Sequence, residues 1–327
     1  MIRLSFAALL VLSACASTAQ QPHAVTVSAG EVMVESEFQK QLVLEQRFID
    51  EHRLKSIRFR ITRGAAPFCR GRTRPDYGLT VATEDSFGVR QRALVRRAFG
   101  FDDHLRVLYV VAGSPAYDAG LRSGDVITRL NGAPTPRGRA GEAAFAALTE
   151  GADAGPLTLN LDGSNPRAVT IEPAATCDFD IEQSSMQTVN AYPTGGRVVV
   201  TKGMMWFASD SELALVVSHE LAHLVMNHGD LSRRLAANFR EIEAEADYVG
   251  LYIMARAGYE VDRAPKFWRR IAANFPRTMA SARTHPATPY RFVAMKKTVA
   301  EINAKIAAGE PLTPNVGRIL ADASGLD

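Results

Sequence analysis

The feature that most constrains this chain is a run of five residues, His219-Glu220-Leu221-Ala222-His223, inside an apolar stretch with helical spacing. Residues four apart lie on one face of a helix, so both imidazoles can reach one metal ion while Glu220 lies beside it. Two histidines and an open coordination position suit a catalytic zinc ion, and the adjacent carboxylate suits removal of a proton from zinc-bound water. The alternative is a helix that carries hydrogen-bonded core histidines.

The residues before the motif predict where its helix begins. Ser209 and Glu212 have the S-x-x-E spacing of a capping box, and apolar residues then continue to Val225. The motif would lie in the middle of a mostly buried helix, where two histidines and a glutamate need partners. Further upstream, Gly195-Gly196 and the β-branched segment 197–200 predict a turn that leads into a strand, which could pair with a substrate backbone.

A third metal ligand is expected downstream of the motif. The metzincin pattern is excluded, because Met226 and Gly229 occupy the places where it requires glycine and histidine. Glu243 and Asp247 are four apart on a helix-like segment and share a face, whereas Glu245 points elsewhere. One carboxylate can bind zinc while the other accepts an N–H from a ligating histidine and fixes its tautomer. A merely acidic, exposed helix is the alternative.

A β-rich pattern occupies the middle of the chain. Segments 77–81 and 105–111 predict strands. Ser114 can cap a short helix that begins with a proline and that Gly120 can end, and Asn131-Gly132 is a strong hairpin signal. This pattern resembles the PDZ domain over about residues 72–173.

PDZ domains bind extended peptides by adding a strand to a sheet edge and by capturing a terminal carboxylate on backbone N–H groups. The resemblance implies that Tyr77-Gly78-Leu79 is the capturing loop, in which Gly78 allows close approach of the backbone. The partners expected here are therefore protein or peptide substrates, held through their C-terminal tails. A PDZ domain that only docks inside the protein is the alternative.

The C-terminal part resembles the HtpX-like, CAAX-prenyl-endopeptidase-like family of zinc metallopeptidases, which are gluzincins. The residues that carry this resemblance are Asn190-Ala191, Gly195-Gly196, 198–203, 219–223, 243–247, Thr284-His285-Pro286 and Arg291. They span roughly residues 178–300, to which the helix expected at 31–60 is added. The resemblance implies one Zn²⁺ ion per chain, held by His219, His223 and Glu243, with Glu220 as general base. It also places His285 and Arg291 near the cleft as catalytic residues, and there His285 could stabilise the oxyanion or gate the site.

The amino terminus is expected to be a targeting segment. Residues 1–3 are a short positive start, and the apolar run 4–12 is too short to span a bilayer. Leu12-Ser13-Ala14-Cys15 resembles the lipobox of bacterial lipoproteins, which implies cleavage before Cys15 and lipidation of its thiol. The protein would then face the periplasm on a membrane anchor, with Ala16 favouring the outer membrane. An ordinary signal peptide is the alternative.

Two cysteines remain after Cys15, and an even pair in an oxidising compartment predicts a disulfide between Cys69 and Cys177. Two buried free thiols are the alternative. The chain carries 38 basic and 35 acidic residues with 8% aromatics, which disfavours a nucleic-acid surface. The arginine cluster formed by Arg70, Arg72 and Arg74 is interpreted as a solvated loop.

These inferences predict an α+β chain, in which a mainly helical gluzincin metallopeptidase domain with a small sheet carries an inserted β-rich PDZ domain. The expected parts are a signal peptide at 1–14, a tether at 15–30, a helical part of the peptidase at 31–66, the PDZ domain at 67–177 and the zinc domain at 178–327. The expected function is a lipid-anchored zinc endopeptidase in protein quality control of the bacterial envelope. An inactive PDZ adaptor, a structural lipoprotein and a hydrolase of other bonds stay open.

Overall fold

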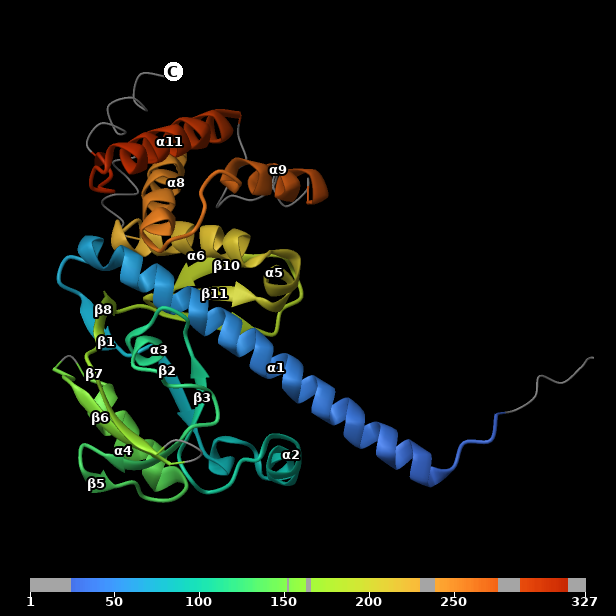
Figure 1. Ribbon diagram of the computed structural model, residues 1–327. Coiled ribbons are helices and arrows are strands. Elements are labelled where there is room, and N and C mark those ends of the chain that lie inside the picture. The colour runs from blue at the N-terminus through green and yellow to red at the C-terminus, as the bar shows by residue number, and fades with distance from the viewer. Residues whose placement is uncertain (1–24, 152, 163–165, 230–238, 276–288, 317–327) are drawn as a thin grey trace, which may run out of the picture. The chain divides into compact units, whose positions relative to one another are not determined.

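A computed structural model describes residues 25–151, 153–162, 166–229, 239–275 and 289–316 (Figure 1). The chain divides into two units, Met1–Leu44 and Glu45–Asp327, and helix α1 (Ala29–Ala65) runs through the boundary. In the first unit, α1 begins with a reciprocal cap. The Ser28 hydroxyl accepts from the N–H of Glu31 at 3.2 Å, and the Glu31 carboxylate accepts from the N–H of Ser28 at 2.8 Å.

In the second unit, α1 is followed by a single turn, η1 (Ala66–Phe68). The β-rich domain is formed by residues after this turn. Its main sheet has the order β2-β3-β4-β6-β7, and β5 pairs with β4. The elements are β2 (Leu79–Ala82), η2 (Glu84–Ser86), α2 (Val89–Phe99), β3 (Arg106–Val110), α3 (Pro115–Asp118), β4 (Val126–Leu130), β5 (Ala133–Pro134), α4 (Arg139–Thr149), β6 (Leu157–Asp162) and β7 (Arg167–Ile171). Alternate residues Leu157, Leu159 and Leu161 are buried with Phe145 of α4, so the helix covers one face of the sheet.

A short two-stranded stem connects this domain to the rest of the second unit. Strands β1 (Thr73–Asp76) and β8 (Ala174–Cys177) pair antiparallel, with Thr73 opposite Cys177. At the base of the stem, Cys69 and Cys177 are joined by a disulfide whose Cα atoms are 5.8 Å apart. The interpretation of the arginine cluster as a solvated loop is wrong for Arg74, because this residue lies in β1 and contacts Asp178 and Asp180.

The C-terminal part of the second unit combines a small sheet with helices. Its sheet has the order β10-β11-β9, in which β9 is parallel and β10 antiparallel to β11. The elements are β9 (Asp180–Ser184), β10 (Ala191–Thr194), β11 (Arg197–Thr201), α5 (Lys202–Phe207), α6 (Asp210–Val225), α8 (Phe239–Arg256), α9 (Ala264–Asn274) and α11 (Pro289–Ala308). Gly195 and Gly196 form the predicted turn between β10 and β11, with φ angles of 55° and 78°. Helix and sheet residues share one core, which includes Val198, Val217 and Tyr252.

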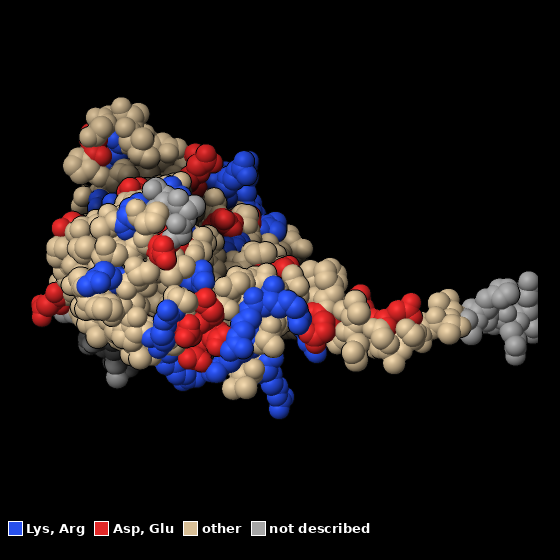
Figure 2. Space-filling model, turned by 60° about the horizontal axis from the view of Figure 1, so that its bottom comes forward, with Lys and Arg blue, Asp and Glu red and all other residues tan. Residues whose placement is uncertain are grey.

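Charged side chains of both signs are interspersed on the face drawn in Figure 2. Within the described ranges, every helix is too short or too polar to cross a bilayer.

The disulfide is expected to stabilise the stem strongly. It closes a loop with a sequence separation of 108 residues, for which the chain-entropy relation gives about 4 to 5 kcal/mol. We therefore expect the double variant Cys69→Ala/Cys177→Ala to lose about 2 to 5 kcal/mol of unfolding free energy in urea denaturation. Reduced wild-type protein is the control and should match the variant. Two free thiols in unfolded, unreduced wild-type protein would contradict the disulfide.

Candidate metal centre

Helix α6 carries the five-residue motif into the protein interior. The predicted capping box is present, because the Glu212 carboxylate accepts from the N–H of Ser209 at 2.9 Å and the Ser209 side chain accepts in return. Apolar residues then bury the helix on all sides. His219, Glu220 and His223 are 1%, 2% and 8% exposed. Polar groups at this depth require partners, and the neighbouring helices supply them.

Helix α8 brings the third donor to the motif. The Nε2 atoms of His219 and His223 lie 3.2 Å apart, and the Glu243 carboxylate oxygens lie 3.5 Å from the first and 3.4 Å from the second. One ligand atom from each of these three residues can be chosen so that all lie within 4.8 Å of one another. Two imidazole nitrogens and one carboxylate oxygen are the donor set of a catalytic zinc site with an open fourth position.

A glycine allows α8 to approach α6 closely enough for this convergence. A Cβ at Gly250 would lie 3.0 Å from the Cα of His219 and 3.1 Å from the oxygen of Ser218. Those distances are too short for an ordinary side-chain contact with backbone. Gly250 lies less than one turn after Asp247 on α8, so the backbone of the motif helix rests directly beside the acidic face.

Asp247 and Arg291 hold the ring of His219. The Nδ1 of His219 lies 3.0 Å from Oδ1 of Asp247. Arg291, on α11, donates to Asp247 through Nε at 2.6 Å and Nη2 at 2.7 Å, and its Nη1 lies 3.5 Å from Glu243. Arg291 is 3% exposed. The structure thus places Arg291 against two acidic side chains as a positioning residue, whereas the family resemblance implies a catalytic residue near the cleft.

The electrostatic environment of this cluster favours a cation. Burial lowers the pKa of His219, but hydrogen bonds and charge interactions with Asp247 and Glu243 raise it to about 10. Burial raises the pKa of Asp247, but Arg291 and His219 hold it below its ordinary value. An imidazole that holds its proton so tightly reports an excess of negative charge around the ring, which is also the condition for binding a metal cation.

A second chain of contacts holds His223, and sequence reasoning missed it. Nδ1 of His228 lies 2.9 Å from Nδ1 of His223, and Nε2 of His228 lies 2.8 Å from Oε2 of Glu245. An ionised Glu245 can only accept, so His228 donates from Nε2 and accepts on Nδ1 from His223. The Nε2 atom of His223 is then unprotonated and can bind a metal. Two features of the sequence could have indicated this contact. His228 follows His223 by five residues, and every second residue from 243 to 247 is acidic.

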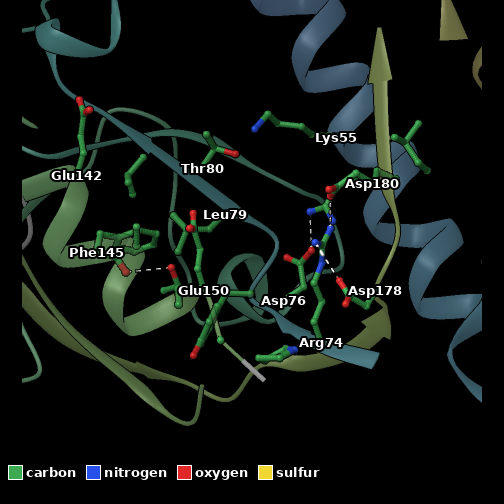
Figure 3. Close-up of a pocket in the computed structure, with 18 of the residues that line it drawn as sticks. Lys55, Arg74, Asp76, Leu79, Thr80, Glu142, Phe145, Glu150, Asp178 and Asp180 are labelled. Atoms are coloured by element: carbon green, nitrogen blue, oxygen red, sulfur yellow. Dashed lines mark hydrogen bonds and ion pairs between the residues drawn. The ribbon is translucent and has the colours of Figure 1, made fainter. Parts of the chain in front are cut away.

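Other predicted residues fall elsewhere. His285 and Cys15 lie outside the described residues. Tyr77 is buried, and its hydroxyl donates to the Gly155 oxygen. Gly78 has a φ of 68°, and a Cβ there would lie 2.1 Å from Ser114 Cβ, so this position requires glycine for the fold itself. Leu79 begins β2, which lies at the edge of its sheet and lines a pocket (Figure 3).

Asp102, Asp103 and His104 are also close enough to one another to share an ion. Asp102 pairs with Arg106 at 2.9 Å and Asp103 with Arg137 at 3.3 Å, and all three residues are at least partly exposed. These ion pairs account for the carboxylates. The cluster at α6 and α8 therefore remains the candidate metal centre.

Comparison with known proteins agrees with this geometry. Residues 170–237 and 229–299 match the model of peptidase family M48, and residues 106–160 match the model of the PDZ domain. The chain is thus similar to peptidase family M48 over residues 170–299 and to the PDZ domain over residues 106–160. The narrower HtpX-like, CAAX-prenyl-endopeptidase-like branch stays a prediction.

The similar curated proteins are mitochondrial metalloendopeptidases named OMA1. The protein of Schizosaccharomyces pombe is 26% identical over 186 residues, which are 46% of this chain and 55% of that protein. The protein of Arabidopsis thaliana is 32% identical over 114 residues, which are 25% of this chain and 24% of that protein. The protein of Saccharomyces cerevisiae is 29% identical over 149 residues, which are 33% of this chain and 43% of that protein. The chain therefore spans about half the length of the first relative and less of the others.

Among solved structures, the HtrA3 PDZ domain bound to a phage-derived ligand matches 32% of this chain and 88% of that chain. Its identity to this chain is 25% and its TM-score is 0.24.

The contact between His228 and His223 gives a prediction for metal affinity. His228→Ala removes the group that fixes the tautomer of His223, so we expect zinc affinity to fall about 10- to 100-fold. Competition with a chromophoric zinc chelator measures it. His52→Ala, a histidine substitution far from α6 in the sequence, is the matched control and should leave the affinity unchanged. An unaltered affinity in folded His228→Ala protein would contradict the role assigned to His228.

Proposed function

We propose that this protein is a zinc-dependent endopeptidase of the bacterial cell envelope, anchored by a lipid on Cys15, that cleaves misfolded or misassembled envelope proteins. The observation that carries the catalytic part is the convergence of His219, His223 and Glu243 beside the buried carboxylate of Glu220. The M48 match and the relatives named metalloendopeptidases support the same activity.

Each residue of the cluster would have its own role in peptide hydrolysis. A zinc ion on the three donors would polarise the scissile carbonyl and make a bound water acidic. Glu220, next to a ligand on the same helix, takes the proton of the attacking water and passes it to the leaving amine. With a metal bound, the Nδ1–H of His219 would face Asp247 and that of His223 would face His228, which leaves each Nε2 for the metal, and Arg291 holds Asp247 in place.

The PDZ domain would supply a place for an extended polypeptide. Strand β2 is an edge strand, and α4 stands beside it, which is the arrangement that accepts an added strand. The envelope location rests on residues 1–15 and on the disulfide, because disulfides persist in oxidising compartments. The mitochondrial location belongs to the named relatives.

Two rival functions make different demands on the metal centre. A structural zinc site needs four protein ligands, whereas the described residues offer His219, His223 and Glu243. An inactive PDZ adaptor needs no intact ligand set and no general base. The buried Glu220, placed beside an intact set of three donors, favours the peptidase over both rivals.

The proposed activity is tested by separating metal binding from proteolysis. Glu220→Gln keeps the shape and the three donors but removes the base, so we expect about one zinc per chain and a cleavage rate reduced at least about 100-fold. Zinc is measured by elemental analysis, and cleavage by release of peptides from reduced, unfolded casein. Glu241→Gln, on the neighbouring helix, is the control. Wild-type rates in Glu220→Gln would overturn the mechanism.

The proposed anchor has its own test. Cys15→Ser removes the thiol that would carry the lipid, so we expect the protein to move from the membrane fraction to the soluble periplasmic fraction and to lose labelling by radioactive palmitate. Equal palmitate labelling of the variant and the wild type would exclude Cys15 as the lipidated residue.

A further inference from the structure

The groove between β2 and α4 is a built slot for an extended chain. A pocket of about 910 Å³ is lined by three consecutive residues of β2, Leu79, Thr80 and Val81, so the backbone edge of the strand faces it (Figure 3). Phe145 of α4 forms the opposite wall. At the far end of this wall, Glu142 accepts from the N–H of Thr83 at 3.0 Å and fixes α4 relative to the strand. An added strand would lie between these walls.

The other side of the same pocket belongs to the host of the PDZ domain. Asp180, Ile181 and Glu182 are consecutive residues of β9, and they line the pocket together with Lys55 of α1. Strand β9 is itself at the edge of its sheet. Figure 3 shows Lys55 pointing from α1 toward Thr80. A segment bound along β2 would therefore also meet β9, the last strand in the order of its sheet, and the cation of Lys55.

The end of the groove that would receive a terminal carboxylate already holds one from this chain. The N–H of Gly78, in the capturing loop, donates to Oδ1 of Asp76 at 2.8 Å. The other oxygen of Asp76 lies 2.6 Å from Nη2 of Arg58 on α1. Both side chains are mostly buried, at 12% and 22% exposure. Asp76 thus occupies a hydrogen-bond donor that a ligand carboxylate would need, and Arg58 holds it there.

The lining of this pocket carries more acidic than basic side chains. Glu150, which follows α4, lines the same pocket. A second carboxylate brought next to Asp76 would meet like charge in a partly buried site, which is unfavourable. The backbone of Gly78 packs directly against Ser114.

We propose that this slot binds an internal, extended segment of a polypeptide along β2, and that it does not select chains by their free C-terminal carboxylate. The segment would run past the Asp76–Arg58 pair and contact β9. The inference deepens the proposed function, since the bound segment would belong to the protein to be cleaved. It requires neither zinc nor Glu220, so binding and cleavage can fail separately.

The test compares one set of peptides in two chemical forms. Ten-residue peptides that tile the sequence of casein are made with either a free C-terminal carboxylate or a carboxamide, and their binding to the full chain carrying Glu220→Gln is measured by fluorescence anisotropy. We expect dissociation constants for the two forms that agree within about twofold. A free acid that binds at least about tenfold more tightly, or a complete lack of binding by either form, would overturn the inference.

Asp76→Ala makes the comparison sharper. This variant frees the N–H of Gly78 and leaves the Arg58 guanidinium to receive a carboxylate. The peptides with a free carboxylate should therefore bind at least about tenfold more tightly than the carboxamides. Asp178→Ala is the matched control, because Asp178 lines the same pocket but pairs with Arg74. This control variant should bind the free acids and the carboxamides with equal affinity. Equal binding in folded Asp76→Ala would overturn the role of Asp76. The wild-type comparison remains decisive if Asp76→Ala does not fold.

Discussion

The close packing of α8 against α6 is the constraint on which the candidate site depends. Gly250 lets the two backbones meet beside His219, and from the same face of α8 Glu243 then reaches both histidines and Asp247 reaches His219. This packing buries several charges, and burying them is costly unless each is paired. Arg291 supplies the compensating positive charge from α11. The ligand geometry, the tautomers and the local negative potential therefore have one structural origin.

The PDZ domain and the metal centre are connected through short elements. The β1–β8 stem and the disulfide between Cys69 and Cys177 define where the domain leaves and rejoins the chain. Strand β9 follows the stem and pairs with β11, which leads through α5 to the motif helix α6. A polypeptide in the slot would thus contact the sheet from which the motif helix continues.

Local patterns predicted the features that depend on local spacing. The capping box at Ser209, the glycine turn before β11 and the shared face of Glu243 and Asp247 follow from helix and turn geometry, and the structure has each of them. The contacts of His228 with His223 and of Asp76 with Gly78 and Arg58 depend on tertiary packing, which a single sequence does not specify. The family resemblance indicates Arg291, but its bidentate contact with Asp247 depends on tertiary packing and is seen only in the structure.

The central claim is that the chain holds zinc through two histidines and one glutamate and leaves a position open for water. X-ray absorption at the zinc edge measures it most directly, because it reports the number and type of atoms bound to the metal. We expect two imidazole nitrogens at about 2.0 to 2.1 Å with oxygen neighbours at about 2.0 to 2.2 Å, and loss of this pattern in His223→Ala. A shell with sulfur, or with four protein ligands and no water, would contradict the assignment of an open catalytic site.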